Sequence, residues 1–284
     1  MTTQEPTVKL PEMSLAEFLE SAPPGTKATI PDLYIIESRI LGPGQYWAVN
    51  TPTIRLYCSS EGCGGPRSFT GEKNVLSSSD QVFLTYTCRN CNQSTKLFAV
   101  TTAHEDPSSA QGTALKLGED PPFGPPMPGR VISLIGPDRE TLLKGRRAEN
   151  LGLGIGAFAY YRRVVENQKG RLIEKIAEVA ARLGADKATL EAFNKAKNET
   201  QFSRAIDDVK KAFPETLMIH GQNPLTLLHS ALSEGLHAQT DEDCLELATS
   251  IRVVLSELAE RISQALKDEA ELKSAVSRLL KPKP

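Results

Sequence analysis

Five prolines within eleven residues divide the sequence into two halves with different hydrophobic patterns. Residues 119–129 read EDPPFGPPMPG. Proline fixes φ and has no amide hydrogen, so we expect this run to be a linker that neither pairs as a strand nor continues a helix. Before the run, short apolar stretches alternate with period two, whereas the apolar spacing after it is helical. The sequence therefore predicts an α+β protein with a β-rich N-terminal part and an α-helical bundle behind it.

Short elements are predicted in the first half. The motif Ser14-Leu-Ala-Glu17 has capping-box spacing and predicts a helix that ends at Pro23-Pro24-Gly25. Residues 1–29 are thus interpreted as an N-terminal helix and lead-in, followed by a β-rich domain over 30–118. The expected strands are separated by Gly, Pro, Asn and Ser clusters and cover Tyr34–Ser38, Thr53–Tyr57, Gln81–Thr87 and Lys96–Thr102.

Residues 130–284 are expected to form the helical bundle. An apolar stripe at helical spacing runs from Ile155 to Leu183, and Gly184 is a suitable left-handed stop. The last helix is expected to begin after the N-cap Thr240 and, if unbroken to Leu280, to be about 60 Å long. Three shorter helices are expected between these two, over Lys187–Lys197, Gln201–Phe213 and Pro224–Glu234.

Four of the five cysteines form two close pairs, Cys58-x4-Cys63 and Cys88-x2-Cys91. Each pair can supply two thiolates from one tight turn, and Zn²⁺ binds four such ligands at roughly 2.3 Å in a tetrahedron. Expected strands lie beside both pairs, which is the plan of a zinc ribbon. We therefore predict one structural Zn²⁺ per chain, with its metal ligands at Cys58, Cys63, Cys88 and Cys91.

Other interpretations of the cysteines are less favourable. Two disulfides would suit an exported protein, but the first residues lack the basic and apolar regions of a secretory signal. A redox site at the second pair would need a helix after it, where we expect a strand. The Gly64-Gly65 and Asn92 that follow the pairs tolerate the left-handed backbone of metal-binding turns. Cys244 lies on the apolar stripe of the last helix and is expected to be buried.

Motifs of catalysis and cofactor binding are weak. The run Gly152-x-Gly154-x-x-Ala157 follows a charged segment rather than a buried strand, so we interpret it as a flexible joint or a close helix contact. His229 and His237 are eight residues apart and converge on a common point only if a helix ends between them. We assign no catalytic residue and expect a protein that is not an enzyme.

Charge is unevenly distributed, although Lys plus Arg (33) nearly balance Asp plus Glu (35). Residues 139–182 carry ten Lys/Arg against five Asp/Glu, whereas residues 234–271 carry three against ten. We favour pairing between this basic segment and this acidic segment, within one bundle or between protomers. The alternative is that the basic side chains bind the phosphates of a nucleic acid while the neighbouring Tyr160-Tyr161 stack on its bases. The candidate contact residues for a partner or a nucleic acid are Arg146, Arg147, Arg162 and Arg163.

The cysteine pairs, the run GRRAENLGLGIGAFAYYRRVVENQKGRLIEKI (145–176) and the run LLHSALSEGLHAQTDEDCLELA (227–248) resemble a group of uncharacterised bacterial proteins. Those proteins join a zinc ribbon to a helical domain that is similar to the HEPN fold, and the resemblance covers residues from about 58 to about 262. It implies that the paired cysteines are the ribbon's ligands. HEPN ribonucleases carry an Arg four to six residues before a His, a motif that this chain lacks, so ribonuclease activity does not carry over. Relatives occur beside defence and restriction proteins, which implies an accessory role there.

These observations predict a non-catalytic, zinc-containing binding or scaffold protein that acts through protein contacts, as a homodimer or with another protein. One alternative is a nucleic-acid-binding accessory protein that uses the ribbon and the basic segment. Another is an unrecognised hydrolase or nuclease that uses His229 or His237. Since no stretch approaches the roughly 18 consecutive apolar residues of a membrane span, we expect a cytoplasmic protein without a membrane partner.

Overall fold

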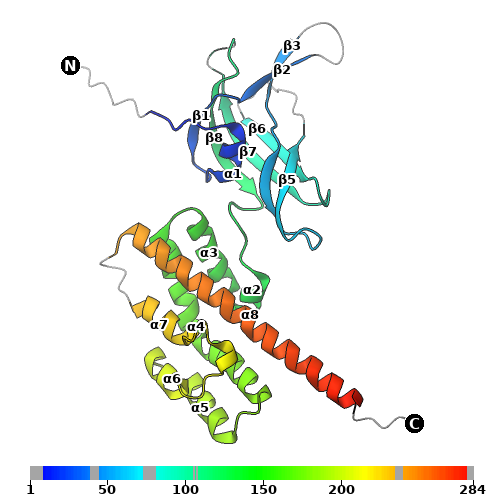
Figure 1. Ribbon diagram of the computed structural model, residues 1–284. Helices are drawn as coiled ribbons and strands as arrows, with labels where there is room; N and C mark the ends of the chain where they lie inside the picture. The colour runs from blue at the N-terminus through cyan, green and yellow to red at the C-terminus, as the bar shows by residue number, and fades with distance from the viewer. Residues whose placement is uncertain are drawn as a thin grey trace, which may run out of the picture. The chain divides into compact units, whose positions relative to one another are not determined.

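The strands and the helices of the chain form two separate compact units. In the computed structural model the first unit is Met1–Pro125 and the second is Pro126–Pro284, so the division falls inside the proline-rich run. The structure describes residues 9–38, 45–72, 81–104, 106, 108–233 and 239–279. Strands fill the first unit and helices the second (Figure 1), which confirms the α+β prediction.

A curled, antiparallel six-stranded sheet forms most of the first unit, with strand order β1-β8-β7-β6-β5-β4. Strands β2 and β3 pair with each other in a second sheet. One short helix, α1 (Leu15–Ser21), begins at the expected N-cap Ser14 and buries Leu15, Phe18 and Leu19. The strands are β1 (Lys27–Ile30), β2 (Tyr34–Ser38), β3 (Gln45–Val49), β4 (Ile54–Cys58), β5 (Gly65–Gly71), β6 (Gln81–Cys88), β7 (Thr95–Ala103) and β8 (Gly112–Asp120).

Four strands were not predicted from the sequence, and three of them, β1, β5 and β8, have a physical reason. β1 has only four residues, and it places part of the expected lead-in inside the main sheet. β5 contains Gly and Pro, and its ladder with β6 begins only at Phe69. β8 has a charged residue, Lys116, at a buried position, and it extends to Asp120, inside the run that was expected to be a linker. β3 lies just after a segment that the structure does not describe.

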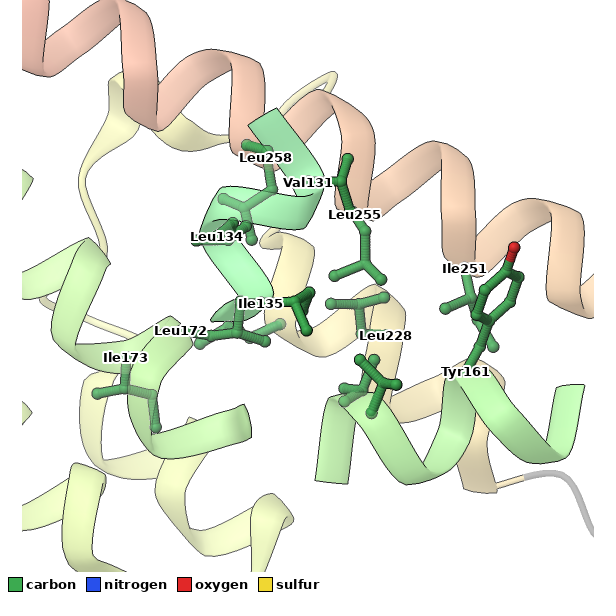
Figure 2. Close-up of a cluster of buried hydrophobic side chains, with 14 of the residues drawn as sticks. Val131, Leu134, Ile135, Tyr161, Leu172, Ile173, Leu228, Ile251, Leu255 and Leu258 are labelled. Carbon is green, nitrogen blue, oxygen red and sulfur yellow. The ribbon is translucent and has the colours of Figure 1, made fainter. Parts of the chain in front are cut away.

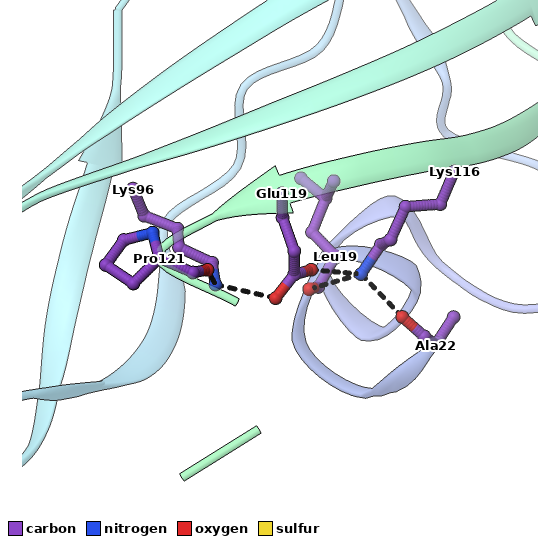
Figure 3. Close-up of polar contacts among 6 residues, drawn as sticks. All are labelled: Leu19, Ala22, Lys96, Lys116, Glu119 and Pro121. Carbon is purple, nitrogen blue, oxygen red and sulfur yellow. Dashed lines mark hydrogen bonds and ion pairs between the residues drawn. The ribbon is translucent and has the colours of Figure 1, made fainter. Parts of the chain in front are cut away.

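Lys116 is a charged residue in the core of the first unit. Its Nζ atom donates hydrogen bonds to the carbonyl oxygens of Leu19 (2.9 Å) and Ala22 (2.6 Å) at the end of α1, and it forms an ion pair with Glu119 at 3.1 Å (Figure 3). Lys96 binds the other Glu119 oxygen at 2.6 Å. The Lys116 ammonium also lies over three aromatic rings, those of Phe18, Phe98 and Phe123. This side chain therefore joins α1 to β8.

Replacing Lys116 with Met should destabilise the first unit by about 3 kcal/mol, because it leaves two carbonyl groups and part of a carboxylate unpaired in the core. Urea unfolding followed by the fluorescence of Trp47, the single tryptophan, measures this change. Lys27→Met, at an exposed position of β1, is the control and should change stability by less than about 0.5 kcal/mol. Equal stability of the two variants would contradict a stabilising role for Lys116.

The second unit is built around the contact between two long helices, α4 (Gly154–Arg182) and α8 (Asp241–Leu279). Their apolar faces meet Val131, Leu134 and Ile135 of the short helix α2 and Leu228 of α7 in one core (Figure 2). The other helices of this unit are α2 (Gly129–Ile135), α3 (Arg139–Asn150), α5 (Lys187–Asn198), α6 (Phe202–Val209) and α7 (Pro224–Ser233).

The long helices agree with their sequence predictions, while one shorter helix differs. α4 is followed by Gly184 in the left-handed region at φ 85°, as expected. The helix expected over Gln201–Phe213 ends at Val209, because the chain then turns toward Pro214. Among the described residues, no helix combines the length and the apolar character that crossing a membrane requires.

The glycine run before α4 is a helix contact rather than a cofactor loop. The Asp241 carboxylate, at the start of α8, accepts hydrogen bonds from the backbone N–H groups of Gly154 and Ile155, both at 2.9 Å. These two donors hold the pKa of Asp241 below its ordinary value. A Cβ atom on Gly154 would lie 1.8 Å from the carbonyl oxygen of Asp241, whereas on Gly156 it would meet only Ala148 at 3.6 Å. The two helix starts therefore pack backbone to backbone.

This contact predicts opposite effects for two neighbouring substitutions. Gly154→Ala should destabilise the helical unit by about 3 kcal/mol, because α8 must move away from α4. Gly156→Ala should be neutral or stabilising by up to about 1 kcal/mol, because alanine is the better residue inside a helix. Thermal unfolding followed by circular dichroism compares the two variants. A stable Gly154→Ala variant would exclude the close contact.

Candidate metal centre

The four paired cysteines come from two neighbouring hairpins. Cys58 is the last residue of β4, and Cys63 lies in the turn between β4 and β5. Cys88 is the last residue of β6, and Cys91 lies in the turn between β6 and β7. Since Phe69 of β5 pairs with Cys88 of β6, the two turns emerge at the same end of the sheet.

The four sulfur atoms form one cluster with the dimensions of a tetrahedral metal site. Each lies within 4.8 Å of the others. The Sγ atoms of Cys58 and Cys91 are 3.8 Å apart, and those of Cys63 and Cys88 are 3.9 Å apart. A regular tetrahedron with metal–sulfur bonds of about 2.3 Å has sulfur–sulfur distances of about 3.8 Å. The four cysteines can therefore hold a metal ion.

Each cysteine turn uses a residue with positive φ, as the sequence analysis expected. Gly64 has φ 49° and Asn92 has φ 53°. The backbone N–H of Cys63 donates to the Ser60 carbonyl at 2.8 Å, and that of Asn92 donates to the Cys88 carbonyl at 2.9 Å. These tight turns fold the second cysteine of each pair back toward the first.

Several polar groups outside the four cysteines contact the cluster. The Asn90 amide donates to Cys63 Sγ at 3.1 Å, and the Ser94 backbone N–H donates to Cys91 Sγ at 3.5 Å. The Ser94 hydroxyl oxygen lies 3.1 Å from Cys58 Sγ. The Arg67 guanidinium donates to the backbone carbonyl oxygen of Cys63 at 2.6 Å, in the first cysteine turn.

The thiols differ in acidity and exposure. Backbone N–H groups of Ser94 and Gln93 lower the pKa of Cys91 to about 5. The Asn90 amide lowers the pKa of Cys63, but burial and the neighbouring thiols raise it more, to about 11. Cys91 is partly exposed, whereas the other three cysteines are buried. The Cys91 thiol is thus readily ionised, whereas a bound cation would have to ionise the Cys63 thiol.

The alternative interpretations of the cysteines do not match this geometry. All five cysteines are free, and sulfur separations of 3.8 and 3.9 Å are far from the roughly 2.05 Å of a disulfide. A strand, β7, follows Cys91, where a thioredoxin-like site would have a helix. Cys244 is fully buried in the helical unit, as expected. With four protein sulfurs around it, an ion in the cluster has no open coordination position, which is the arrangement of structural rather than catalytic sites.

The four candidate arginines do not form one exposed group. Arg146 is buried and pairs with Glu149 at 2.8 Å, and Arg162 pairs with Glu166 at 2.9 Å. Both carboxylates belong to the basic segment itself. Pairing of these arginines with the acidic segment, within one bundle or between protomers, stays a prediction. Arg147 and Arg163 are exposed. Adjacent residues on a helix point in directions about 100° apart, so the two arginines of each pair differ in exposure.

The candidate histidines are dispersed. The His229 ring packs edge-on against Phe202 at 5.6 Å between centroids. His104 lies in the first unit, stacked on Tyr34 at 4.1 Å. His220 has a positive φ of 47° in a turn. His237 lies outside the described residues, so its distance from His229 stays untested.

Glu149 is a buried residue whose role the sequence analysis missed. It accepts hydrogen bonds from Tyr161 at 2.7 Å, from Thr249 at 3.1 Å and from Arg252 at 2.8 Å, in addition to its pairing with Arg146. The carboxylate therefore connects α3, α4 and α8. Burial raises the pKa of Glu149, but these donors lower it more, and the pKa lies below the ordinary 4.5.

Comparisons with protein-family models, with curated proteins and with solved structures give no match.

Glu149→Gln should destabilise the helical unit by about 3 kcal/mol at pH 7, because two arginines lose their buried counter-charge. The folded-state pKa of Glu149 is lowered, so its contribution is complete above about pH 4.5 and is lost as the pH falls through the folded-state pKa. The difference between parent and variant should therefore shrink in acid. Urea unfolding followed by circular dichroism tests this, with the exposed Glu166→Gln as a control that changes stability by less than about 0.5 kcal/mol. A pH-independent difference would contradict the account.

Proposed function

We propose that the four cysteines bind one structural Zn²⁺ per chain and that the two hairpins form a zinc ribbon. The observation that carries this proposal is the sulfur cluster, in which two separations, 3.8 and 3.9 Å, match the edges of a zinc–thiolate tetrahedron and all four sulfurs lie within 4.8 Å of one another. Four soft thiolates in a tetrahedron favour zinc, with iron as the main competitor. The left-handed turns at Gly64 and Asn92 support a site that is shaped for a metal.

Elemental analysis of the purified protein should give one zinc and no stoichiometric iron per chain. Cys91→Ser should lose most of the zinc, because an alcohol is a much poorer ligand than a thiolate. Cys244→Ala removes the buried cysteine of the helical unit and should keep the full amount. Iron in place of zinc, or zinc retained by Cys91→Ser, would overturn the assignment.

We further propose that the chain is a non-catalytic binding or scaffold protein of the cytoplasm, with a HEPN-like helical unit. The closed sulfur cluster supports a structural rather than a catalytic metal, and the dispersed histidines among the described residues support the same conclusion. A homodimer through the long helices is the proposed form, because α8 has 39 residues against 29 in α4 and extends beyond the helices it packs on (Figure 1). Sedimentation velocity tests this, and a monomer at micromolar concentration would overturn it.

Nucleic-acid binding is the second candidate function. Arg147 and Arg163 are exposed, and Tyr160 is 37% exposed on the same helical hairpin of α3 and α4. Two cations and one aromatic ring favour only weak binding. For each phosphate contact, the logarithm of the binding constant falls by about 0.7 to 0.9 per log unit of salt.

We expect weak oligonucleotide binding whose logarithmic salt slope does not exceed about 2, since only two of the four candidate arginines are available. Arg147→Glu with Arg163→Glu should abolish this binding. Arg182→Glu with Lys187→Glu, at exposed positions at the end of α4 and the start of α5, makes the same charge change and should leave binding unaltered. Fluorescence anisotropy titrations over a range of salt concentrations measure the slope. Tight binding with a steeper slope would make nucleic acid the principal partner.

A further inference from the structure

Each of the two sulfur pairs in the cluster has a polar contact from a different side chain. Ser94 contacts the pair formed by Cys58 and Cys91, with its hydroxyl oxygen 3.1 Å from the first sulfur and 3.7 Å from the second. Asn90 contacts the other pair, donating from its amide to Cys63 Sγ at 3.1 Å. Both residues lie in the turn between β6 and β7, within three residues of Cys91.

We propose that Ser94 and Asn90 are positioning residues of the metal centre, each donating a hydrogen bond to one pair of ligand thiolates and thereby setting the affinity for the metal. This inference rests on the proposed zinc site. In the thiol form, Cys58 donates to the Ser94 hydroxyl. When the ligands are thiolates, a sulfur has no proton to donate, so the same short contact requires the hydroxyl to donate instead.

The physical reason for such donors is the charge of the site. Four thiolates and one Zn²⁺ carry a net charge of −2, and three of the four cysteines are buried. A buried negative charge is costly unless hydrogen-bond donors compensate it. The amide of Asn90 and the hydroxyl and backbone N–H of Ser94 supply that compensation from the protein.

Ser94 has a second role in the geometry of the turn. Its carbonyl oxygen accepts the backbone N–H of Cys88 at 2.9 Å, while its own N–H donates to Cys91 Sγ at 3.5 Å. One residue thus contacts three of the four cysteines. Because the backbone groups remain in any Ser94 variant, substitution of the side chain isolates the hydroxyl.

The test is the zinc affinity of the full chain, measured by competition with a chromophoric chelator at fixed pH. Ser94→Ala and Asn90→Ala should each weaken binding by about 10- to 100-fold, the usual cost of removing an outer hydrogen bond to a metal ligand. Ser94→Thr retains the hydroxyl and should restore most of the affinity. Asn90→Asp has nearly the same shape but no donor, so it should weaken binding more than Asn90→Ala. The control is Gln93→Ala, an exposed side chain in the same turn, which should bind like the parent.

Co²⁺ substitution provides a spectroscopic readout that loss of fold alone does not produce. Removing a donor leaves a more electron-rich thiolate, so the sulfur-to-cobalt charge-transfer band of Ser94→Ala and Asn90→Ala should shift to lower energy while that of Gln93→Ala stays unchanged. Asn90 is exposed, so its variants should keep the fold. A parent that binds zinc through four sulfurs, together with variants within about twofold of its affinity and an unshifted band, would overturn this inference alone. A parent without stoichiometric zinc would overturn the proposed site and this inference together.

Discussion

The four cysteine sulfurs lie where the β4–β5 hairpin meets the rest of the sheet, and a metal bound by them would join the two. Among the described residues, three residue pairs join β5 to β6, from Phe69–Cys88 to Gly71–Tyr86, whereas seven pairs join β6 to β7. The sulfur cluster lies at the Phe69–Cys88 end of the β5–β6 ladder. A metal bound there would hold two hairpins together with coordinate bonds where backbone hydrogen bonds are few, which explains why a structural ion suits this fold.

Each unit also has a buried charged residue that joins elements far apart in the sequence. In the first unit Lys116 of β8 binds the end of α1, and in the second Glu149 of α3 binds Arg252 of α8. These charges are compensated by several hydrogen bonds each, so removing one partner leaves the others unpaired in the core. The helical unit has its own apolar core, in which no cysteine of the cluster takes part.

The sequence predicted the features that depend on local pattern. Cysteine spacing identified the four cysteines that the fold brings together, and helical periodicity located α4 and α8 within a few residues. Prediction from the sequence failed where long-range contacts determine the structure. β8 contains a buried lysine, whose partners are Glu119 and the carbonyl oxygens of Leu19 and Ala22 at the end of α1, and the strand therefore has no alternating apolar pattern. Likewise Arg146 is buried beside Glu149, which also accepts a hydrogen bond from Tyr161, and composition does not reveal this pairing.

Amide hydrogen exchange before and after chelation tests most directly whether a metal holds the β4–β5 hairpin to the rest of the sheet in the first unit. If it does, removing the metal should accelerate exchange in β4, β5 and the two cysteine turns, while the amides of α4 and α8 keep their protection because their core does not include the cluster. Unchanged exchange in β4 and β5 after complete removal of the metal would contradict this account. A parallel loss of protection in α4 and α8 would contradict it as well.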